Sequence, residues 1–392
     1  MSTAPKGFRF ATACAGFRKE GRADLALLVS DVPAVAAGTF TQNRFPAAPV
    51  LVAKAMLAER PAARAVVINS GQANACTGDE GMRNCRTTQE LVAGALGLEA
   101  SDILPASTGV IGAQLKMDLW EKAAPALAAN LGKATPEDFA RAIMTTDAFH
   151  KISHREVSLP GGVVKLAGMA KGAGMICPNM ATMLSVVLCD VQVEASVWQK
   201  MLRDAVELTF NRVDGDTSTN DTLYGLANGA SGVSASDEES IKALSAALTS
   251  VLGDLAYMLV KDGEGASKVA RIHVTGAASD ADAERVARTV GHSQLVKTAL
   301  YGRDANWGRI VAAVGRSGAD FNPDDVVVTL CGVELFRKGQ PTDLDFDALL
   351  QEPLKQRDLS IDIVLGSGSG SYTLLASDLG HEYVNVNADY RS

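Results

Sequence analysis

Residues 171–184, with the sequence KGAGMICPNMATML, contain a threonine, Thr182, whose hydroxyl group could take part in a reaction. Small residues surround Thr182, which comes directly before the apolar run 183–191 that is typical of a buried strand. A threonine hydroxyl at such a place can act as a nucleophile once a base accepts its proton. It can equally be a strand-start residue whose hydroxyl bonds only to the backbone. Residue type and spacing leave both roles open.

Three other segments carry residue types that occur in active sites. Residues 105–109, PASTG, predict a small-residue turn that needs no chemical role. Glu264 lies in a glycine-flanked loop, where a carboxylate is either solvated or a partner for an ammonium group. His150 and His154 are four residues apart, but no carboxylate in an HExxH arrangement accompanies them. We interpret them as surface imidazoles.

Several common site motifs are absent from the sequence. GxxxxGK[ST] and GxSxG do not occur, which excludes a P-loop nucleotide site and the usual α/β-hydrolase nucleophile. The glycines of residues 366–370 lack the spacing of a dinucleotide fingerprint and predict a hairpin loop. Six cysteines without a CxxC pair predict neither a disulfide framework nor a zinc cluster. We therefore expect no metal and no bound cofactor.

The net charge and the distribution of apolar residues indicate which classes of partner are not expected. The 392 residues include 37 basic and 45 acidic side chains, which gives a net charge of −8. Because phosphate binding needs a basic stripe, we do not expect a nucleic acid as partner. No apolar run reaches the roughly 18 residues of a membrane helix, and the first ten residues have no signal-peptide pattern. We expect a cytoplasmic protein without a membrane partner.

Short strands are mixed with helices in the predicted order, without a strict βαβ alternation, and this favours an α+β fold. Strands are predicted at residues 25–30, 34–40, 49–53, 65–69, 183–191, 269–274, 325–331, 359–365 and 372–377. Helices are predicted at residues 87–96, 118–130, 136–144, 195–210, 236–260 and 280–290.

The stretch around Thr182 resembles the KGxGMIxPxMATML signature of the ornithine acetyltransferase family, the glutamate N-acetyltransferases of arginine biosynthesis. Seven further blocks are similar to those of the family and follow in family order. They are NSGQANACTG (69–78), STGVIG (107–112), MTTD (144–147), DGDTSTNDT (214–222), KDGEGASK (261–268), LVKT with DANWGR (295–298 and 304–309) and YVNVNADYRS (383–392). Each block is short, but together they cover almost the whole chain and are highly specific.

The resemblance implies a self-cleaving enzyme of the N-terminal-nucleophile type. Its implied cleavage site is the bond between Ala181 and Thr182, which gives an α chain of residues 1–181 and a β chain of residues 182–392. Cleavage would give Thr182 a free α-amine with a pKa of about 7.7–8.0, which can accept the proton of its own hydroxyl. The implied fold is an α/β sandwich around the nucleophile strand with a second α/β domain. The implied assembly is a heterotetramer of two α and two β chains.

The implied reaction is acetyl transfer from N-acetylornithine to Thr182 and from there to glutamate, in a ping-pong sequence. Thr108 and Gly109 are the implied donors to the oxyanion. The implied substrate-binding residues are Thr145, Lys171, Thr182, Glu264, Asn387 and Ser392. Some members of the family also accept acetyl-CoA as co-substrate, and no motif in this sequence separates the two types.

Two alternatives stay open beside this hypothesis. One is a related N-terminal-nucleophile amidohydrolase or aminopeptidase, which would release acetate instead of transferring it. The other is a paralogous ornithine acetyltransferase of a specialised pathway. A non-enzymatic binding protein is disfavoured because the implied catalytic residues are all present. Departures from the family pattern are mild: Gln72 replaces an asparagine, and His150 and Lys151 stand where a proline–lysine pair is expected.

Overall fold

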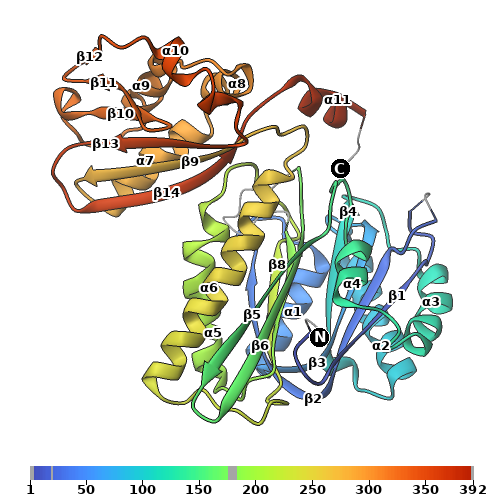
Figure 1. Ribbon diagram of the computed structural model, residues 1–392. Helices are drawn as coiled ribbons and strands as arrows, with labels where there is room; N and C mark the ends of the chain where they lie inside the picture. Colours follow the sequence, from blue (N-terminus) through green and yellow to red (C-terminus); the bar gives the residue numbers. More distant parts are fainter. Residues whose placement is uncertain (1–3, 19–20, 175–182, 390–392) are drawn as a thin grey trace. The chain divides into compact units, whose positions relative to one another are not determined.

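The computed structural model describes residues 4–18, 21–174 and 183–389, which form two compact units (Figure 1). Unit 1 is made of residues up to 211 and residues 216–259, and unit 2 of residues 212–215 and 260–390. The implied cut between Ala181 and Thr182 falls within the sequence span of unit 1. The two compact units and the two implied chains are therefore different divisions of the protein.

Unit 1 is built on one mixed sheet and six α-helices. Its strands are β1 (Phe8–Ala13), β2 (Leu25–Phe40), β3 (Ala62–Gln72), β4 (Ile103–Val110), β5 (Lys151–Leu159), β6 (Gly162–Lys171), β7 (Leu184–Cys189) and β8 (Thr222–Ala227). Its helices are α1 (Ala48–Glu59), α2 (Gly78–Leu96), α3 (Met117–Ala129), α4 (Pro136–Ala142), α5 (Ala195–Leu208) and α6 (Glu238–Lys261). The sheet order is β4-β3-β2-β8-β7-β6-β5, and β1 also pairs with β2. The pairs β3–β4 and β7–β8 are parallel.

Both faces of β2 and β3 are buried, because helices lie on either side of them. Successive side chains of a strand point to opposite faces. Leu28 accordingly belongs to the same buried cluster as Phe139 of α4, whereas its neighbour Leu27 belongs to the cluster that contains Trp120 of α3. This double burial explains why these strands have nearly continuous apolar sequences.

Two longer helices cover the other strands of unit 1. Trp198 of α5 lies against Gly225 of β8, and Leu255 of α6 lies against Gly168 of β6. By length and apolar composition α6 could also cross a membrane. Its fully buried residues in this fold include Leu244, Leu248, Val251, Leu252, Leu255 and Leu259. These residues show that α6 serves as a core helix of unit 1.

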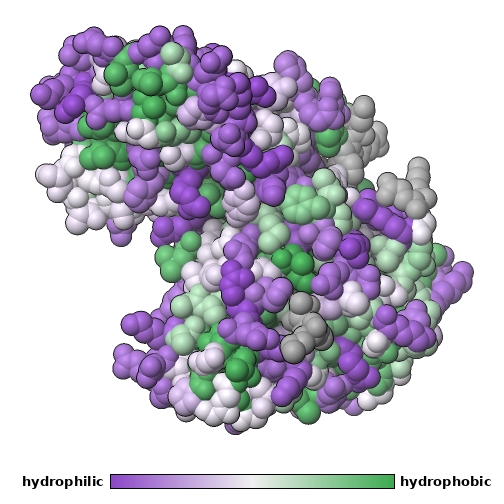
Figure 2. All heavy atoms as spheres, in the orientation of Figure 1, coloured by the Kyte–Doolittle hydropathy of each residue, from purple (hydrophilic) through white to green (hydrophobic). Residues whose placement is uncertain are grey.

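Unit 2 has a six-stranded sheet of order β12-β11-β10-β13-β9-β14. The strands are β9 (Val269–Ala277), β10 (Val327–Leu330), β11 (Val333–Arg337), β12 (Gln340–Pro341), β13 (Asp358–Val364) and β14 (Gly370–Ser377). The helices are α7 (Asp280–Gly291), α8 (Gln294–Gly302), α9 (Trp307–Gly315), α10 (Phe346–Leu350) and α11 (His381–Asp389). Alternate residues of β13, such as Ile361 and Ile363, form one core with Val286 and Val290 of α7. Hydrophilic side chains cover much of both units in the view of Figure 2, with hydrophobic residues in separate groups.

The mixed sheets and their helices confirm the α+β fold class, and most predicted elements are present with shifted ends. Three local predictions are wrong. Residues 49–53 lie in α1, because a short apolar run does not by itself distinguish a strand from a buried helix. Residues 105–109 belong to β4, where β3 pairs with them in parallel. Residues 366–370 do not close a hairpin, since β13 and β14 pair with opposite sides of β9.

Replacement of Leu28 by alanine is expected to destabilise unit 1. The side chain is fully buried, and removing it leaves a cavity that typically costs about 2–5 kcal/mol. Val163→Ala is the control, because the Val163 side chain is 50% exposed. Thermal unfolding followed by circular dichroism should show a lower midpoint for Leu28→Ala alone, and equal midpoints for the two variants would contradict the assignment of the core.

Candidate active site

The end of β6 and the starts of β7 and β8 lie side by side in unit 1. Lys171, the last residue of β6, lies opposite Leu184, the first residue of β7. The amide of Met183 donates to Asp221 Oδ1 at 2.8 Å, and the amide of Thr222 donates to the carbonyl of Met183 at 3.0 Å. The residue that follows Thr182 is thus held on both sides. Ala181 and Thr182 themselves lie outside the described residues.

The buried side chains of Thr108 and Lys171 contact each other. Lys171 Nζ donates to Thr108 Oγ1 at 3.2 Å, and both residues are buried. Because the lysine occupies an acceptor position of the hydroxyl, the hydroxyl proton remains available for donation to another group. The contact brings together, from β4 and β6, two residues that the resemblance assigns to oxyanion stabilisation and substrate binding.

Gly109 must be a glycine for steric reasons. It pairs with Gly71 across the parallel β3–β4 ladder, and its φ is +133°. A Cβ atom at this position would lie 2.2 Å from the carbonyl carbon of Gly71. The close approach of the two backbones therefore requires glycine whatever role its amide has in catalysis.

Asp147 connects the segments that carry Thr145 and Lys171. Its Oδ2 accepts from the amide of Thr145 at 2.9 Å, and its Oδ1 accepts from the amide of Gly172 at 2.6 Å. Oδ1 also accepts from Lys151 Nζ at 2.7 Å, in an ion pair whose two side chains are both fully buried. The Asp147 carboxylate thus holds the backbone at Thr145 and at Gly172, the residue that follows Lys171.

The protonation state of Asp147 follows from its surroundings. Burial acts to raise the pKa of this carboxyl, but the charges of Lys171 and Lys151 and the hydrogen bonds from Lys151 and Gly172 outweigh it. The pKa of Asp147 therefore lies well below its ordinary value, and the group is ionised at neutral pH.

Two arginines hold the same segment from its other side. Arg18 donates to the carbonyls of Met144 and Thr145 at 2.7 and 3.1 Å. Arg22 donates to the carbonyl of Thr145 at 2.9 Å. The backbone of Thr145 is therefore fixed at both its amide and its carbonyl, which orients its side chain.

Asparagine side chains connect three of the sequence blocks in this region. Ser107 donates to Asn69 Oδ1 at 2.7 Å, which joins the blocks 107–112 and 69–78. The amide group of Asn220 donates to the carbonyls of Ala73 and Ser107 at 2.6 and 2.8 Å, which adds the block 214–222. These buried hydrogen bonds fix the end of β4 that carries Thr108.

Unit 2 contains the remaining implied substrate residues that the structure describes. Asn387 of α11 donates to Glu264 Oε2 at 2.8 Å. The loop that carries Glu264 contacts the start of α11 so closely that a Cβ atom on Gly265, whose φ is +71°, would lie 2.7 Å from the Tyr383 amide nitrogen. Asp378 fixes the same loop by accepting from the amides of Ser267 and Lys268 at 2.8 and 3.0 Å. Ser392 lies outside the described residues.

The implied site residues are therefore found in two groups, one in each unit. Thr108, Gly109, Lys171 and Thr145 are connected within unit 1, and Glu264 and Asn387 are paired within unit 2. The residues that the sequence alone did not single out are Asp147, Asn220 and Asp221. All three belong to blocks that are similar to those of the family. Their polar residue type within such a block is the feature of the sequence that could have indicated them.

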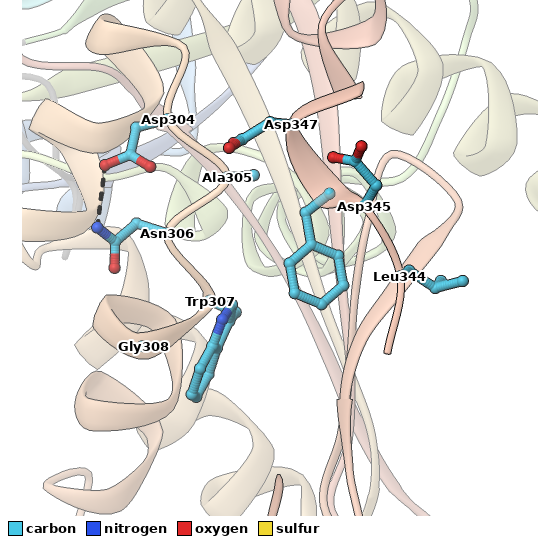
Figure 3. Close-up of a pocket in the computed structure, with 9 residues that line it drawn as sticks. Asp304, Ala305, Asn306, Trp307, Gly308, Leu344, Asp345 and Asp347 are labelled. Carbon is cyan, nitrogen blue, oxygen red and sulfur yellow. Dashed lines mark hydrogen bonds between the residues drawn. The ribbon is translucent and has the colours of Figure 1, made fainter. Parts of the chain in front are cut away.

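A cavity of about 450 Å³ lies elsewhere in unit 2 (Figure 3). Its lining residues are Asp304, Ala305, Asn306, Trp307, Gly308, Leu344, Asp345, Phe346 and Asp347. Asp304 accepts from the side chain of Asn306 at 2.9 Å, and Asp345 accepts from the Ala348 amide at the start of α10. Two of its three carboxylates thus have local structural roles, and the lining includes no implied site residue.

Comparisons with known proteins cover the whole chain. The model of the ArgJ family matches residues 9–392. The arginine biosynthesis bifunctional protein ArgJ of Nitratidesulfovibrio vulgaris is 72% identical over 394 residues, which covers 100% of both chains. The protein of the same name from Thermosynechococcus vestitus is 44% identical over 406 residues, which covers 99% of this chain and 97% of that protein.

Solved structures include a relative with a bound ligand. The ornithine acetyltransferase of Mycobacterium tuberculosis, complexed with ornithine, is 36% identical with a TM-score of 0.41. The match covers 46% of this chain and 95% of that chain.

Replacement of Asp147 by asparagine is expected to destabilise the protein at neutral pH by about 3–5 kcal/mol, because the buried Lys151 loses its counter-charge. The pKa of Asp147 is lowered by folding, so its contribution is present above the ordinary carboxyl pKa of about 3.9 and is lost as the pH falls below it. Urea unfolding at pH 7 measures this difference between wild type and variant, and the difference should shrink as the pH is lowered below about 3.9. Asp254→Asn is the control, because Asp254 forms an ion pair with Arg155 in which the two side chains are 41% and 40% exposed. A loss no larger than that of the control would contradict the role of Asp147.

Proposed function

The chain belongs to the ArgJ family, and we propose that it is a glutamate N-acetyltransferase that moves the acetyl group of N-acetylornithine to glutamate. One geometric observation carries the proposal. Lys171, which lies opposite Leu184 at the start of β7, donates to the Thr108 hydroxyl, so the proton of that hydroxyl stays available for another acceptor. The amidohydrolase alternative is not favoured, because the full-length relatives are named for arginine biosynthesis.

In the proposed reaction, the Thr182 hydroxyl attacks the acetyl carbonyl of N-acetylornithine while the α-amine of Thr182 accepts the proton. The Thr108 hydroxyl and the Gly109 amide donate to the oxyanion of the tetrahedral intermediate. The bond from the acetyl carbon to the ornithine nitrogen then breaks, and the proton held by the amine passes to that nitrogen. The glutamate amine next attacks the acetyl ester by the same route and restores the threonine.

We propose that the enzyme first cleaves itself. The Thr182 hydroxyl attacks the carbonyl of Ala181, the peptide bond becomes an ester, and water hydrolyses the ester to free the α-amine. This gives the chains 1–181 and 182–392, which we propose assemble as two copies of each. Internal Thr182 has no free amine, so the uncut chain lacks the base on which transfer depends.

The proposed substrate-binding residues are those that the family resemblance implies, namely Thr145, Lys171, Glu264, Asn387 and Ser392. Glu264 is suited to an ammonium group and Lys171 to a carboxylate or the acetyl oxygen. The word bifunctional in the names of the relatives supports a second activity, for which we propose acetyl-CoA as donor and glutamate as acceptor. We also propose that the enzyme works in the cytoplasm, without a metal or a bound cofactor.

The Thr182→Ala variant is expected to remain a single chain and to have no transfer activity, because alanine has no hydroxyl to attack the preceding carbonyl. Wild-type protein should run as two bands on a denaturing gel, and mass spectrometry should place the new N-terminus at Thr182. Incubation with N-acetylornithine and glutamate should yield N-acetylglutamate rather than free acetate. A different cut site, or cleavage of the alanine variant, would refute the proposed nucleophile.

Replacement of Thr108 by valine is expected to slow both self-cleavage and acetyl transfer by about 10²–10³-fold, since both steps pass through an oxyanion. Thr39→Val is a matched control on β2, because the Thr39 hydroxyl is buried without a hydrogen-bond partner among the described residues. Cleavage time courses and steady-state kcat measure the two steps. If Thr108→Val matches the control in both, the hydroxyl has only a structural role.

A further inference from the structure

The helix α11 of unit 2, which carries Asn387, has little buried surface. Its residues 381–385 are all exposed, and Val384 is 63% exposed. Most helices in proteins are stabilised by packing an apolar face against a core. Because this part of α11 packs no such face, the position of Asn387 depends strongly on the specific contacts that α11 makes with the rest of unit 2.

One of these contacts involves Gly265, in the loop 262–268 that joins α6 to β9. Its φ is +71°, a conformation that residues with a side chain rarely adopt. A Cβ atom at this position would lie 2.7 Å from the Tyr383 amide nitrogen and 2.9 Å from the Glu382 carbonyl carbon. Both atoms belong to the backbone of α11, so a change of rotamer cannot make room. A side chain at residue 265 has to move the loop and the helix apart.

The hydrogen bond between Glu264 and Asn387 joins the same loop to the same helix. Asn387 Nδ2 donates to Glu264 Oε2 at 2.8 Å and to the carbonyl of Tyr383 at 2.9 Å. Both partners are acceptors, so they determine which end of the amide group faces them. The amide thereby holds one oxygen of the Glu264 carboxylate. This geometry requires the close approach that Gly265 permits.

We propose that Gly265 is a positioning residue for substrate binding, because its lack of a side chain lets Glu264 and Asn387 act as one pair. The role rests on the proposed function, in which both residues bind the amino-acid substrate. Polar groups that are already oriented bind more tightly, since less freedom is lost on binding. In the proposed reaction neither residue moves a proton or holds the oxyanion. Their contribution is therefore the same in the ground state and in the transition state, which lowers KM without changing kcat.

Gly318 is a matched control within unit 2. Its φ is +73°, but a Cβ atom at this position would have no atom of another segment within 4 Å. Alanine therefore has the same unfavourable backbone conformation at both positions, and only at residue 265 does it meet another segment. The difference between Gly265→Ala and Gly318→Ala isolates the effect of the contact.

The test uses the full-length protein and steady-state kinetics with N-acetylornithine as the varied substrate. For Gly265→Ala we expect KM to rise about tenfold or more while kcat stays within about threefold of wild type. Gly318→Ala should keep KM within about twofold of wild type. Self-cleavage of both variants should match wild type on a denaturing gel, because the implied cut falls within the sequence span of unit 1.

A second substitution separates the contact from the backbone conformation. Asparagine adopts positive φ more readily than alanine, but it has the same Cβ atom. Gly265→Asn should therefore raise KM as Gly265→Ala does, and it keeps the test available if the alanine variant does not fold. A wild-type KM for Gly265→Asn would show that only the backbone conformation matters, and the inference would be wrong.

A double-mutant cycle tests whether Gly265 acts through the pair. Asn387→Ala removes the hydrogen bond to Glu264 and should itself raise KM. If Gly265→Ala acts by separating the two residues, the double variant should have a KM within about twofold of that of Asn387→Ala alone. Two effects that multiply would contradict a shared cause.

The outcomes distinguish this inference from the function on which it rests. If wild type transfers no acetyl group, or if Glu264→Gln leaves KM unchanged, the proposed function or its substrate site fails. If wild type is active and Glu264→Gln raises KM, equal KM values for Gly265→Ala and Gly318→Ala overturn only the role of Gly265. A loss confined to kcat would overturn it as well.

Discussion

Charges removed from water must be compensated nearby, and this requirement organises the candidate active site. Asp147, Lys151, Lys171 and Asp221 are all buried in unit 1. A carboxylate or ammonium in such a place is tolerated when opposite charges and hydrogen-bond donors surround it. The compensation of Asp147 by Lys151, Lys171 and two backbone amides connects β5, the end of β6 and the segment before β5. The Asp147 carboxylate that takes part in this balance also holds the backbone at Thr145 and at Gly172, which follows Lys171.

The sequence indicates candidate reactive residues more readily than the residues that position them. Thr108, Lys171 and Glu264 lie in blocks whose residue types already indicate chemistry. Asp147 and Asp221 lie in similar blocks, but their importance comes from burial and from contacts with distant backbone amides. The pairing of Glu264 with Asn387 spans 123 residues, so local patterns cannot reveal it. The nucleophile Thr182, the cleavage site and Ser392 stay predictions, because they lie outside the described residues.

The fold was predictable wherever an element has a strong period or a clear cap. The capping box at Thr135 and Asp138, with Pro136 in the first turn, marks the start of α4 in both sequence and structure. The errors arise where short segments depend on their neighbours. Residues 105–109 are extended because β3 offers a ladder, and residues 366–370 cross the end of β9 because both flanking strands pair with it. Strand order is a long-range property that turn residues do not determine.

The order of strands in unit 1 has a consequence for how two chains would stay together. β7 and β8 follow the implied cut in the sequence, yet they lie between β2 and β6, which precede it. A cut at this place leaves two polypeptides that alternate within one sheet and share its buried faces. Their separation would require breaking the ladders on both sides of β7 and β8, so dilution alone would not dissociate them. The shared sheet of unit 1 would unfold as one body, and chains from two different molecules would not exchange without its unfolding.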